Sequence, residues 1–165
     1  MHLRGYQETD AAATRAVFTR AIRVTARRDY TSEQIDAWAG DDHDDAQWHS
    51  ARAAANTHVA EIHQRLAGFI DVSAEGYIDM LFVDPAHSRE GVASALLHWA
   101  ETTAREAGAL RLSTHSSITA RSFFEAHGFV VDEELAPVRH GHALTNYRMT
   151  AALDEPGLFD APAPA

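Results

Sequence analysis

The stretch VDPAHSREGVASALLHWAE, residues 83–101, leads from an apolar strand end through a proline and a short loop directly into a helix. Gly91 stands at the helix start, and Val92 and Leu96 then fall on one helical face. We therefore expect a buried strand followed at once by an amphipathic helix. That helix should end near Gly108, where a C-terminal glycine is typical.

The helix start, Ser88–Ser94, predicts an anion site. The first four N–H groups of a helix lack intrahelical partners, and the helix dipole adds about half a positive charge there. Gly91 and Ala93 are small enough to let a phosphate approach the backbone. A tight strand-to-helix turn that binds nothing would use the same small residues, so spacing alone leaves both interpretations open. The loop lacks the glycine patterns of dinucleotide folds and P-loops.

Outward from this stretch, the hydrophobic periodicity predicts a chain of mixed helices and strands. The expected elements before it are a strand at 3–6, helices at 11–28, 32–39 and 46–54, and strands at 58–63, 66–72 and 77–83. After the quoted helix come a strand at 110–114, a helix at 118–128, and strands at 129–135 and 143–149. This order predicts an α+β fold with a mostly antiparallel sheet, and a crossover around the quoted helix that joins two parallel strands.

Length and composition predict one soluble domain. At 165 residues the chain suits a single core, which we assign to residues 1–152, with 153–165 as a flexible tail containing DAPAPA. No apolar run approaches the ~20 residues of a membrane span. The N-terminus has no secretory signal pattern, so we expect a cytoplasmic protein that binds no membrane.

Several site types are disfavoured. Cysteine is absent, which removes disulfides and thiolate chemistry, and the net charge of -10 disfavours nucleic-acid binding. The acidic run 41–45 lacks the ligand spacing of a calcium loop and is interpreted as a helix-capping loop. His140 and His142 are expected to share a strand face, but no third ligand is evident, so we expect no metal.

Two motifs resemble those of the GCN5-related N-acetyltransferase (GNAT) family. VDPAHSREGVASALL is similar to the family pattern of Gln or Arg, two residues, Gly, one residue, then Gly or Ala, although Ser88 and Glu90 depart from it. SSITARSFFEAHGF, residues 116–129, resembles the second motif, with Phe124 where the family often has tyrosine. The resemblance covers residues 3–150. RAIRVTARRDYTSEQIDAWA with YIDMLFVDP resembles more narrowly the YafP-like bacterial branch.

This resemblance implies a splayed sheet of about seven strands flanked by helices on both faces, and acetyl-CoA as co-substrate. The cofactor pyrophosphate is expected on the amides of the helix start, and its pantetheine arm along the strand that ends at Val83. Ser117 caps the following helix, contacts the cofactor, or does both. The implied cofactor contacts are Leu81, Phe82, Val83, Ser88, Arg89, Glu90, Gly91, Val92, Ala93, Ser94, Ser117 and Phe124.

Acetyl transfer needs a neutral amine, a donor for the carbonyl oxygen and a proton for the departing thiolate. An alkylamine costs about 4.6 kcal/mol to deprotonate at pH 7, so a base matters. Asp79 is the first candidate, because it has the strand parity of Leu81 and apolar neighbours would raise its pKa. A purely structural carboxylate is the alternative. A backbone N–H near Leu81 is the expected oxyanion donor.

The proton donor and the acceptor pocket are less defined by the sequence. Because Phe124 supplies no phenol, His115, Tyr147 or water is the candidate acid. By family resemblance, Tyr30, Trp38 and the loop containing His140 shape the acceptor pocket, although Trp38 also suits an ordinary core position.

The sequence therefore predicts an acetyl-CoA-dependent N-acetyltransferase that acts on a primary amine of a small molecule or peptide by direct attack in a ternary complex. A catalytically silent acyl-CoA sensor is the alternative, motivated by Phe124, Ser88 and Glu90. Acetylation of charged tRNA would need a basic face, which a net charge of -10 disfavours. A homodimer is expected only by analogy with family members.

Overall fold

The structure is a computed structural model that describes residues 1–40 and 44–153 of the chain. The expectations for residues 41–43 of the acidic run and for the tail from 154 onward lie outside the described residues. Leu153, which the sequence interpretation placed in the tail, is buried and donates its N–H to Leu110 O at 3.0 Å. The packed domain therefore extends at least one residue beyond the predicted boundary.

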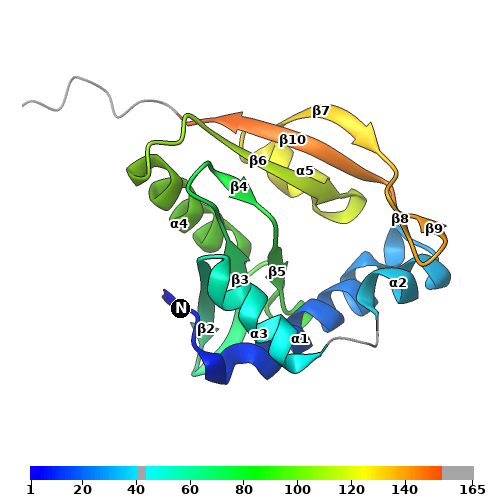
Figure 1. Ribbon diagram of the computed structural model, residues 1–165, viewed down its shortest axis with the longest axis horizontal. Helices are drawn as coiled ribbons and strands as arrows, with labels where there is room; N and C mark the ends of the chain where they lie inside the picture. The colour runs from blue at the N-terminus through cyan, green and yellow to red at the C-terminus, as the bar shows by residue number, and fades with distance from the viewer. Residues whose placement is uncertain (41–43, 154–165) are drawn as a thin grey trace, which may run out of the picture.

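Two four-stranded sheets form the centre of the fold (Figure 1). The first is antiparallel throughout and runs in the order β1 (His2–Gly5), β2 (Thr57–Ile62), β3 (Arg65–Asp71) and β5 (Leu81–Val83). The second has the order β4 (Tyr77–Ile78), β6 (Arg111–Ser117), β10 (Asn146–Ala152) and β7 (Val130–Leu135). Its β4–β6 pairing is parallel, whereas β6–β10 and β10–β7 are antiparallel. The predicted mixed fold and its crossover are confirmed.

Helices pack on both faces of this sheet system (Figure 1). The N-terminal helices are α1 (Ala11–Arg20), α2 (Ser32–Ala39) and α3 (Asp45–Ala54). The helices of the second half are α4 (Val92–Glu106) and α5 (Ile118–Ala126). A short hairpin of β8 (Val138–Arg139) and β9 (His142–Ala143) lies beside α2. Among the described residues, no helix is long and apolar enough to cross a bilayer.

Three predicted elements are interrupted. The expected helix over 11–28 continues past α1 as a π-helical turn, η2 (Ala21–Thr25), and a 3-10 turn, η3 (Ala26–Arg28). The expected strand 77–83 breaks between Ile78 and Leu81. The expected strand 143–149 is divided between β9 and β10. Hydrophobic periodicity does not detect these breaks, because it reports which side chains are buried rather than which backbone bonds form.

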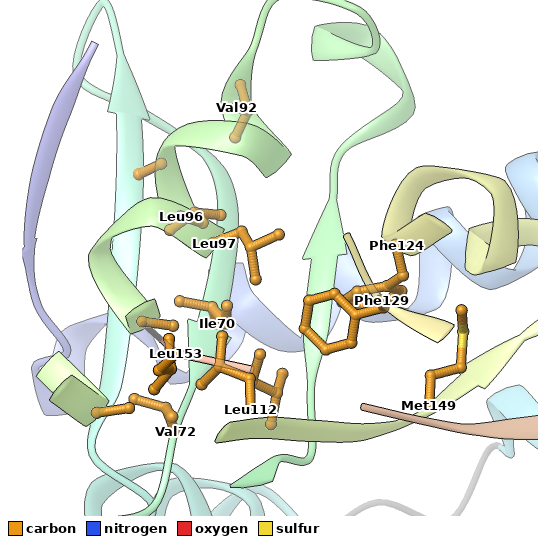
Figure 2. Packing of buried hydrophobic residues seen from close by; sticks show 14 of the residues in the cluster. Ile70, Val72, Val92, Leu96, Leu97, Leu112, Phe124, Phe129, Met149 and Leu153 are labelled. Atoms are coloured by element: carbon orange, nitrogen blue, oxygen red, sulfur yellow. The ribbon is translucent and has the colours of Figure 1, made fainter. Parts of the chain in front are cut away.

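The hydrophobic core has two parts, one on each face of the first sheet. One packs α4 and α5 against residues such as Ile70, Leu112 and Met149 (Figure 2). The other packs α1–α3 against Val59 and Phe69. Gly68 lets α4 approach β3 closely, since a Cβ there would lie 3.0 Å from Val92 Cγ1. Burial on both faces fixes β3, and with it the position of its neighbour β5.

Candidate active site

The two sheets diverge at the break between β4 and β5. β4 pairs with β6, whereas β5 pairs with β3. At the break, the N–H groups of Asp79 and Met80 both donate to Asp71 Oδ1, each at 3.0 Å. Asp71 N in turn donates to Met80 O at 3.1 Å. This side-chain bridge replaces regular strand pairing and separates β5 from the second sheet.

β5 is the terminal strand of its sheet, so its outer edge carries unpaired backbone groups. Met80 O and Asp84 N bond to β3, through Asp71 N at 3.1 Å and Ala67 O at 2.8 Å. Because backbone groups alternate sides along a strand, the N–H and C=O of Leu81 and Val83 point away from β3. This free edge can accept an extended ligand as an additional strand.

A cavity of about 610 Å³ lies along the free edge. Its wall comes from β5, the loop before α4, the first turn of α4, α5 and the end of the first helix. Among the described residues of the wall, the arginines are Arg28 and Arg89, and no Asp or Glu is present. A positive cavity in a chain of net charge -10 favours an anionic ligand.

The helix start at α4 has the geometry of an anion site. Gly91, the N-cap residue, has φ +79°, and a Cβ there would meet no atom within 4 Å. The left-handed conformation favours glycine, and the open space before it leaves the backbone accessible. Ala95 N makes the first intrahelical bond, to Gly91 O at 3.0 Å, so the N–H groups of the preceding turn are available for a ligand.

Asp84 holds the loop that leads into this helix start. Its Oδ1 accepts the Ala86 N–H at 3.0 Å, and its Oδ2 accepts from Arg20 Nε at 3.0 Å. Burial alone would raise the pKa of Asp84, but these hydrogen bonds and the Arg20 charge lower it below its usual value. Arg20 therefore ties the end of α1 to the candidate anion loop.

Two polar side chains lie at the ends of α5, Ser117 and His127, and of these Ser117 lines the cavity. Ser117 Oγ accepts from Ala120 N at 3.1 Å, so its predicted capping role is confirmed, and the residue also lines the cavity. His127 was not singled out from the sequence. Its Nδ1 lies 2.8 Å from the Phe123 carbonyl oxygen, which can only accept, so Nδ1 carries the proton. Its Nε2 lies 3.1 Å from Ser94 Oγ, beside the first turn of α4.

The remaining wall comes from the π-helical turn, which sequence analysis missed. Ala21, Ile22 and Thr25 from this turn line the cavity together with Trp38 of α2. π-helical turns recur at functional sites because the widened turn re-aims side chains within a helix. No residue type marks it in the sequence, since all of these residues also suit an ordinary α-helix.

Comparison with known families now identifies the chain. Residues 26–151 match the family model described as an Acetyltransferase (GNAT) domain. The chain belongs to the GNAT acetyltransferase family. It is 39% identical over 149 residues to YafP, an uncharacterized N-acetyltransferase of Escherichia coli K12, which covers 90% of this chain and 94% of YafP. The resemblance to this branch is therefore confirmed, and the chain is an acyltransferase of the GNAT type.

Solved structures agree with this assignment. A GCN5-related N-acetyltransferase from Rhodopseudomonas palustris superimposes with a TM-score of 0.89 at 32% identity, covering 92% of this chain and 95% of that one. YncA from Salmonella typhimurium, determined with acetyl-CoA, gives a TM-score of 0.66 at 22% identity, covering 98% of this chain and 99% of that one. The latter likeness concerns the fold.

Within this GNAT fold, all but two of the residues predicted to contact the cofactor line the cavity. Glu90 instead turns to His87, with Oε2 3.0 Å from Nδ1. Phe124 is only 3% exposed, packs against Phe129 in the core and does not line the cavity, so its cofactor contact stays a prediction. Its neighbour Phe123 lines the cavity, because successive helical residues point about 100° apart.

The predicted catalytic residues lie outside the cavity wall. Asp79 has a side chain that is 56% exposed, with Oδ2 3.9 Å from Arg52 Nη2, so its expected apolar surroundings are wrong. His115 lies on the exposed face of β6, with Nδ1 3.4 Å from Tyr77 OH. Tyr147 lies on the opposite face, where the Arg121 guanidinium carbon is 4.6 Å from its ring centre.

Of the three residues predicted to shape the pocket for the amine substrate, one lines the cavity and two do not. Trp38 lines the cavity and packs against Phe82, and its role in an acceptor pocket stays a prediction. Tyr30 is buried and off the wall, where its OH donates to Thr145 O at 2.6 Å and accepts from Ile118 N at 2.9 Å. His140 is exposed in the β8–β9 turn and does not reach the wall. Among the described residues, no group of three or more ligand side chains is placed to hold a metal.

Proposed function

We propose that this GNAT acyltransferase transfers an acetyl group from acetyl-CoA to a primary amine of a small molecule or peptide, by direct attack within a ternary complex. The observation that carries the proposal is one cavity that joins the free edge of β5 to the N-terminus of α4. Acetyl-CoA combines an amide-bearing arm with a diphosphate. Its arm can therefore pair with the strand edge while its diphosphate binds at the helix start. The acetyl-CoA complex of YncA, which has the same fold, supports this choice.

The residues present fit such a ligand. Leu81 and Val83 offer backbone N–H and C=O groups to the two amides of the pantetheine arm. The open space at Gly91 and the positive charge of Arg89 suit the diphosphate. Ser117 and Ser94 add hydroxyl groups to the cavity wall. The proposal therefore assigns binding mainly to backbone groups, so the departures at Ser88 and Glu90 remove none of the proposed main contacts.

In the proposed reaction, the neutral amine nitrogen attacks the thioester carbonyl carbon. A C–N bond forms, the C–S bond breaks, and its electron pair leaves with sulfur. The nitrogen loses a proton and the thiolate takes one up, so the products are an amide and a free thiol. We assign the Leu81 N–H to the carbonyl oxygen, where negative charge develops, because it faces the cavity from a fixed strand.

Proton transfer is assigned to groups on the open face of the second sheet. The proposal keeps Asp79 as base for its place just before β5 rather than for apolar surroundings, and His115 as proton donor, with water as the relay because neither lines the cavity. Tyr77 joins them, with its OH 3.4 Å from His115 Nδ1. Burial, and then the charges of Asp79 and Asp71, raise the pKa of Tyr77, so it stays protonated at neutral pH.

A catalytically silent acyl-CoA sensor is the second candidate. It is favoured by one observation: among the described residues, the cavity wall has no carboxylate and no tyrosine, and Phe124 is buried. Apart from His87, which pairs with Glu90, such a wall offers a bound thioester no side-chain acid or base. A sensor would bind acetyl-CoA and leave the rate of thiol release unchanged in the presence of any amine.

The test is calorimetric titration with acetyl-CoA, followed by thiol release with a panel of amines and peptides. Micromolar binding with amine-dependent thiol release supports the transferase, whereas binding without release supports the sensor. Absence of binding contradicts both.

A glycine pair provides the matched control. Gly91→Ala and Gly108→Ala each strain a left-handed residue, with φ +79° and +88°, whose Cβ would face open space. Both should lower the free energy of unfolding by about 1 kcal/mol. Only Gly91→Ala should weaken acetyl-CoA binding, by about tenfold or more, because only Gly91 lines the cavity. Equal acetyl-CoA affinities in the two variants would contradict the proposal that the cofactor binds at the N-terminus of α4.

A further inference from the structure

A buried ion pair, Arg52 with Asp71, lies at the start of β5 and off the cavity wall. The side chains of Asp71 and Arg52 are 2% and 5% exposed, and Arg52 Nη1 contacts Asp71 Oδ2. The Arg52 guanidinium also lies 5.4 Å from the centre of the Trp48 ring. Neither Asp71 nor Arg52 lines the cavity, so any influence on a bound ligand passes through the backbone.

The other oxygen of Asp71 binds backbone. Asp71 Oδ1 accepts the N–H groups of two consecutive residues, Asp79 and Met80, each at 3.0 Å. Consecutive N–H groups of a regular strand point to opposite sides. A single acceptor for both therefore imposes a bulge at this point of the chain.

The bulge decides which backbone groups of β5 face the cavity. With the Met80 N–H directed at Asp71 and Met80 O accepting from Asp71 N, alternation places the Leu81 N–H on the free edge. Without the bulge, the strand would continue with the opposite phase, and the Leu81 N–H would point to β3. A shift of one residue reverses the edge to which each backbone N–H points, just as it reverses the face to which each side chain points.

We propose that Asp71 is a positioning residue for acetyl transfer. Held by Arg52, its carboxylate fixes the Asp79–Met80 bulge and thereby presents the Leu81 N–H to the carbonyl oxygen and the Val83 backbone to the pantetheine arm. The inference rests on the proposed function for its catalytic consequence. The backbone geometry itself is independent of that function. Sequence analysis missed both residues, because Asp71 reads as the end of an apolar strand and Arg52 as a surface position on a short helix.

The experiment compares two double variants in which no buried charge is left unpaired. Arg52→Met with Asp71→Asn keeps a side-chain oxygen for the two N–H groups. Arg52→Met with Asp71→Leu has nearly the same shape and no acceptor. Loss of one well-placed oxyanion donor costs about 100-fold in kcat or more. We therefore expect the asparagine variant to keep kcat within about threefold of the parent, and the leucine variant to lose about 100-fold.

Amide hydrogen exchange at Asp79 and Met80 gives a readout that does not depend on turnover. Exchange should stay slow in the asparagine variant and become fast in the leucine variant. Equal kcat values in the two variants, or slow exchange in the leucine variant, would overturn the proposal. If the leucine variant does not fold, Arg52→Met with Asp71→Ala also removes the side-chain acceptor, and the same outcomes apply to it.

A matched control separates positioning from general destabilisation. Asp10 is also buried, accepts the Gln7 N–H at 2.8 Å and pairs with Arg4, but it lies near β1 and away from the cavity wall. Arg4→Met with Asp10→Leu should lower stability and leave kcat unchanged. A comparable loss of kcat in this control would show that the Asp71 variants lose activity through general destabilisation and not through the position of the Leu81 N–H. If the parent releases no thiol with any amine, the proposed function fails, while hydrogen exchange and CoA affinity still decide whether Asp71 sets the bulge.

Discussion

β5 is held at both ends by a carboxylate paired with an arginine, but the two ends differ in their exposure to water. At its start, Asp71 and Arg52 have side chains that are 2% and 5% exposed. At its end, the Asp84 side chain is 11% exposed and that of Arg20 is 50% exposed. Both carboxylates also accept backbone N–H groups. The two ends of β5 thus have the same kind of Asp–Arg pair, one excluded from water and the other partly hydrated.

The difference appears in the pKa values. Burial raises the pKa of Asp71 despite Arg52 and the two N–H groups. At Asp84, burial also acts to raise the pKa, but the Arg20 and Ala86 hydrogen bonds prevail and lower it. Desolvation grows with burial faster than the gain from one partner. The buried pair at the start of β5 is therefore costly to desolvate, whereas the partly hydrated pair at its end costs less and lies next to the loop where we propose that the phosphate binds.

The largest effect is expected from Arg52→Met, which leaves the Asp71 carboxylate buried without a counter-charge. Breaking a buried pair in this way typically costs about 3–5 kcal/mol of unfolding free energy. Urea denaturation measures it. A loss under about 1 kcal/mol would mean that water reaches this end of β5, and the contrast between the ends would disappear.

A smaller effect is expected from Asp84→Ala, which removes the cap of the 3-10 turn Pro85–His87 and the partner of Arg20. Loss of such a cap costs about 0.5–2 kcal/mol. Acetyl-CoA affinity should also fall, because Asp84 holds the loop before α4. Denaturation and calorimetry on the same preparation test both parts. A stability loss as large as that of Arg52→Met would show that the two ends are equivalent.

Arg20→Met is the matched partner of Arg52→Met and should cost at most about 1 kcal/mol, since half-exposed ion pairs contribute little. The remaining Asp84 carboxylate keeps its Ala86 N–H and gains water. The same urea series measures this variant. Two arginine-to-methionine changes of equal cost would contradict the assignment of a dry and a hydrated end.

The smallest effect is a pH dependence of opposite sign at the two ends. For Asp84, whose pKa is lowered on folding, the stabilisation is present above the unfolded pKa of about 3.9 and lost as pH falls through the folded pKa. For Asp71, whose pKa is raised, stability is greatest below about pH 3.9 and is lost as pH rises through the folded pKa. Unfolding free energies of Asp71→Asn and Asp84→Asn between pH 3 and 7 should diverge from the parent in opposite directions. Parallel curves would contradict the pKa assignment.

The sequence predicted a structural feature when the hydrogen-bonding residues that form it lie close together along the chain, and failed when they lie far apart. The Ser117 cap and the helix start at Gly91 were predictable because their donors and acceptors lie within three or four residues. The break in the strand 77–83 was not, because its acceptor lies eight residues before Asp79 and is held by an arginine 19 residues earlier still. Asp79 was selected on strand parity, and the bulge altered that parity.

The sequence by itself determined the order of helices and strands, the glycine at the start of α4 and the GNAT family, since each is encoded in short contiguous patterns of apolar, small and capping residues. Only the tertiary structure decided where the chain leaves the second sheet after β4, which edge of β5 is free and which carboxylate is buried. Those features depend on contacts between α3, β3 and β5. Burial and hydrogen bonding across such distances emerge only when the elements pack, because the same residues in an extended chain are all solvated.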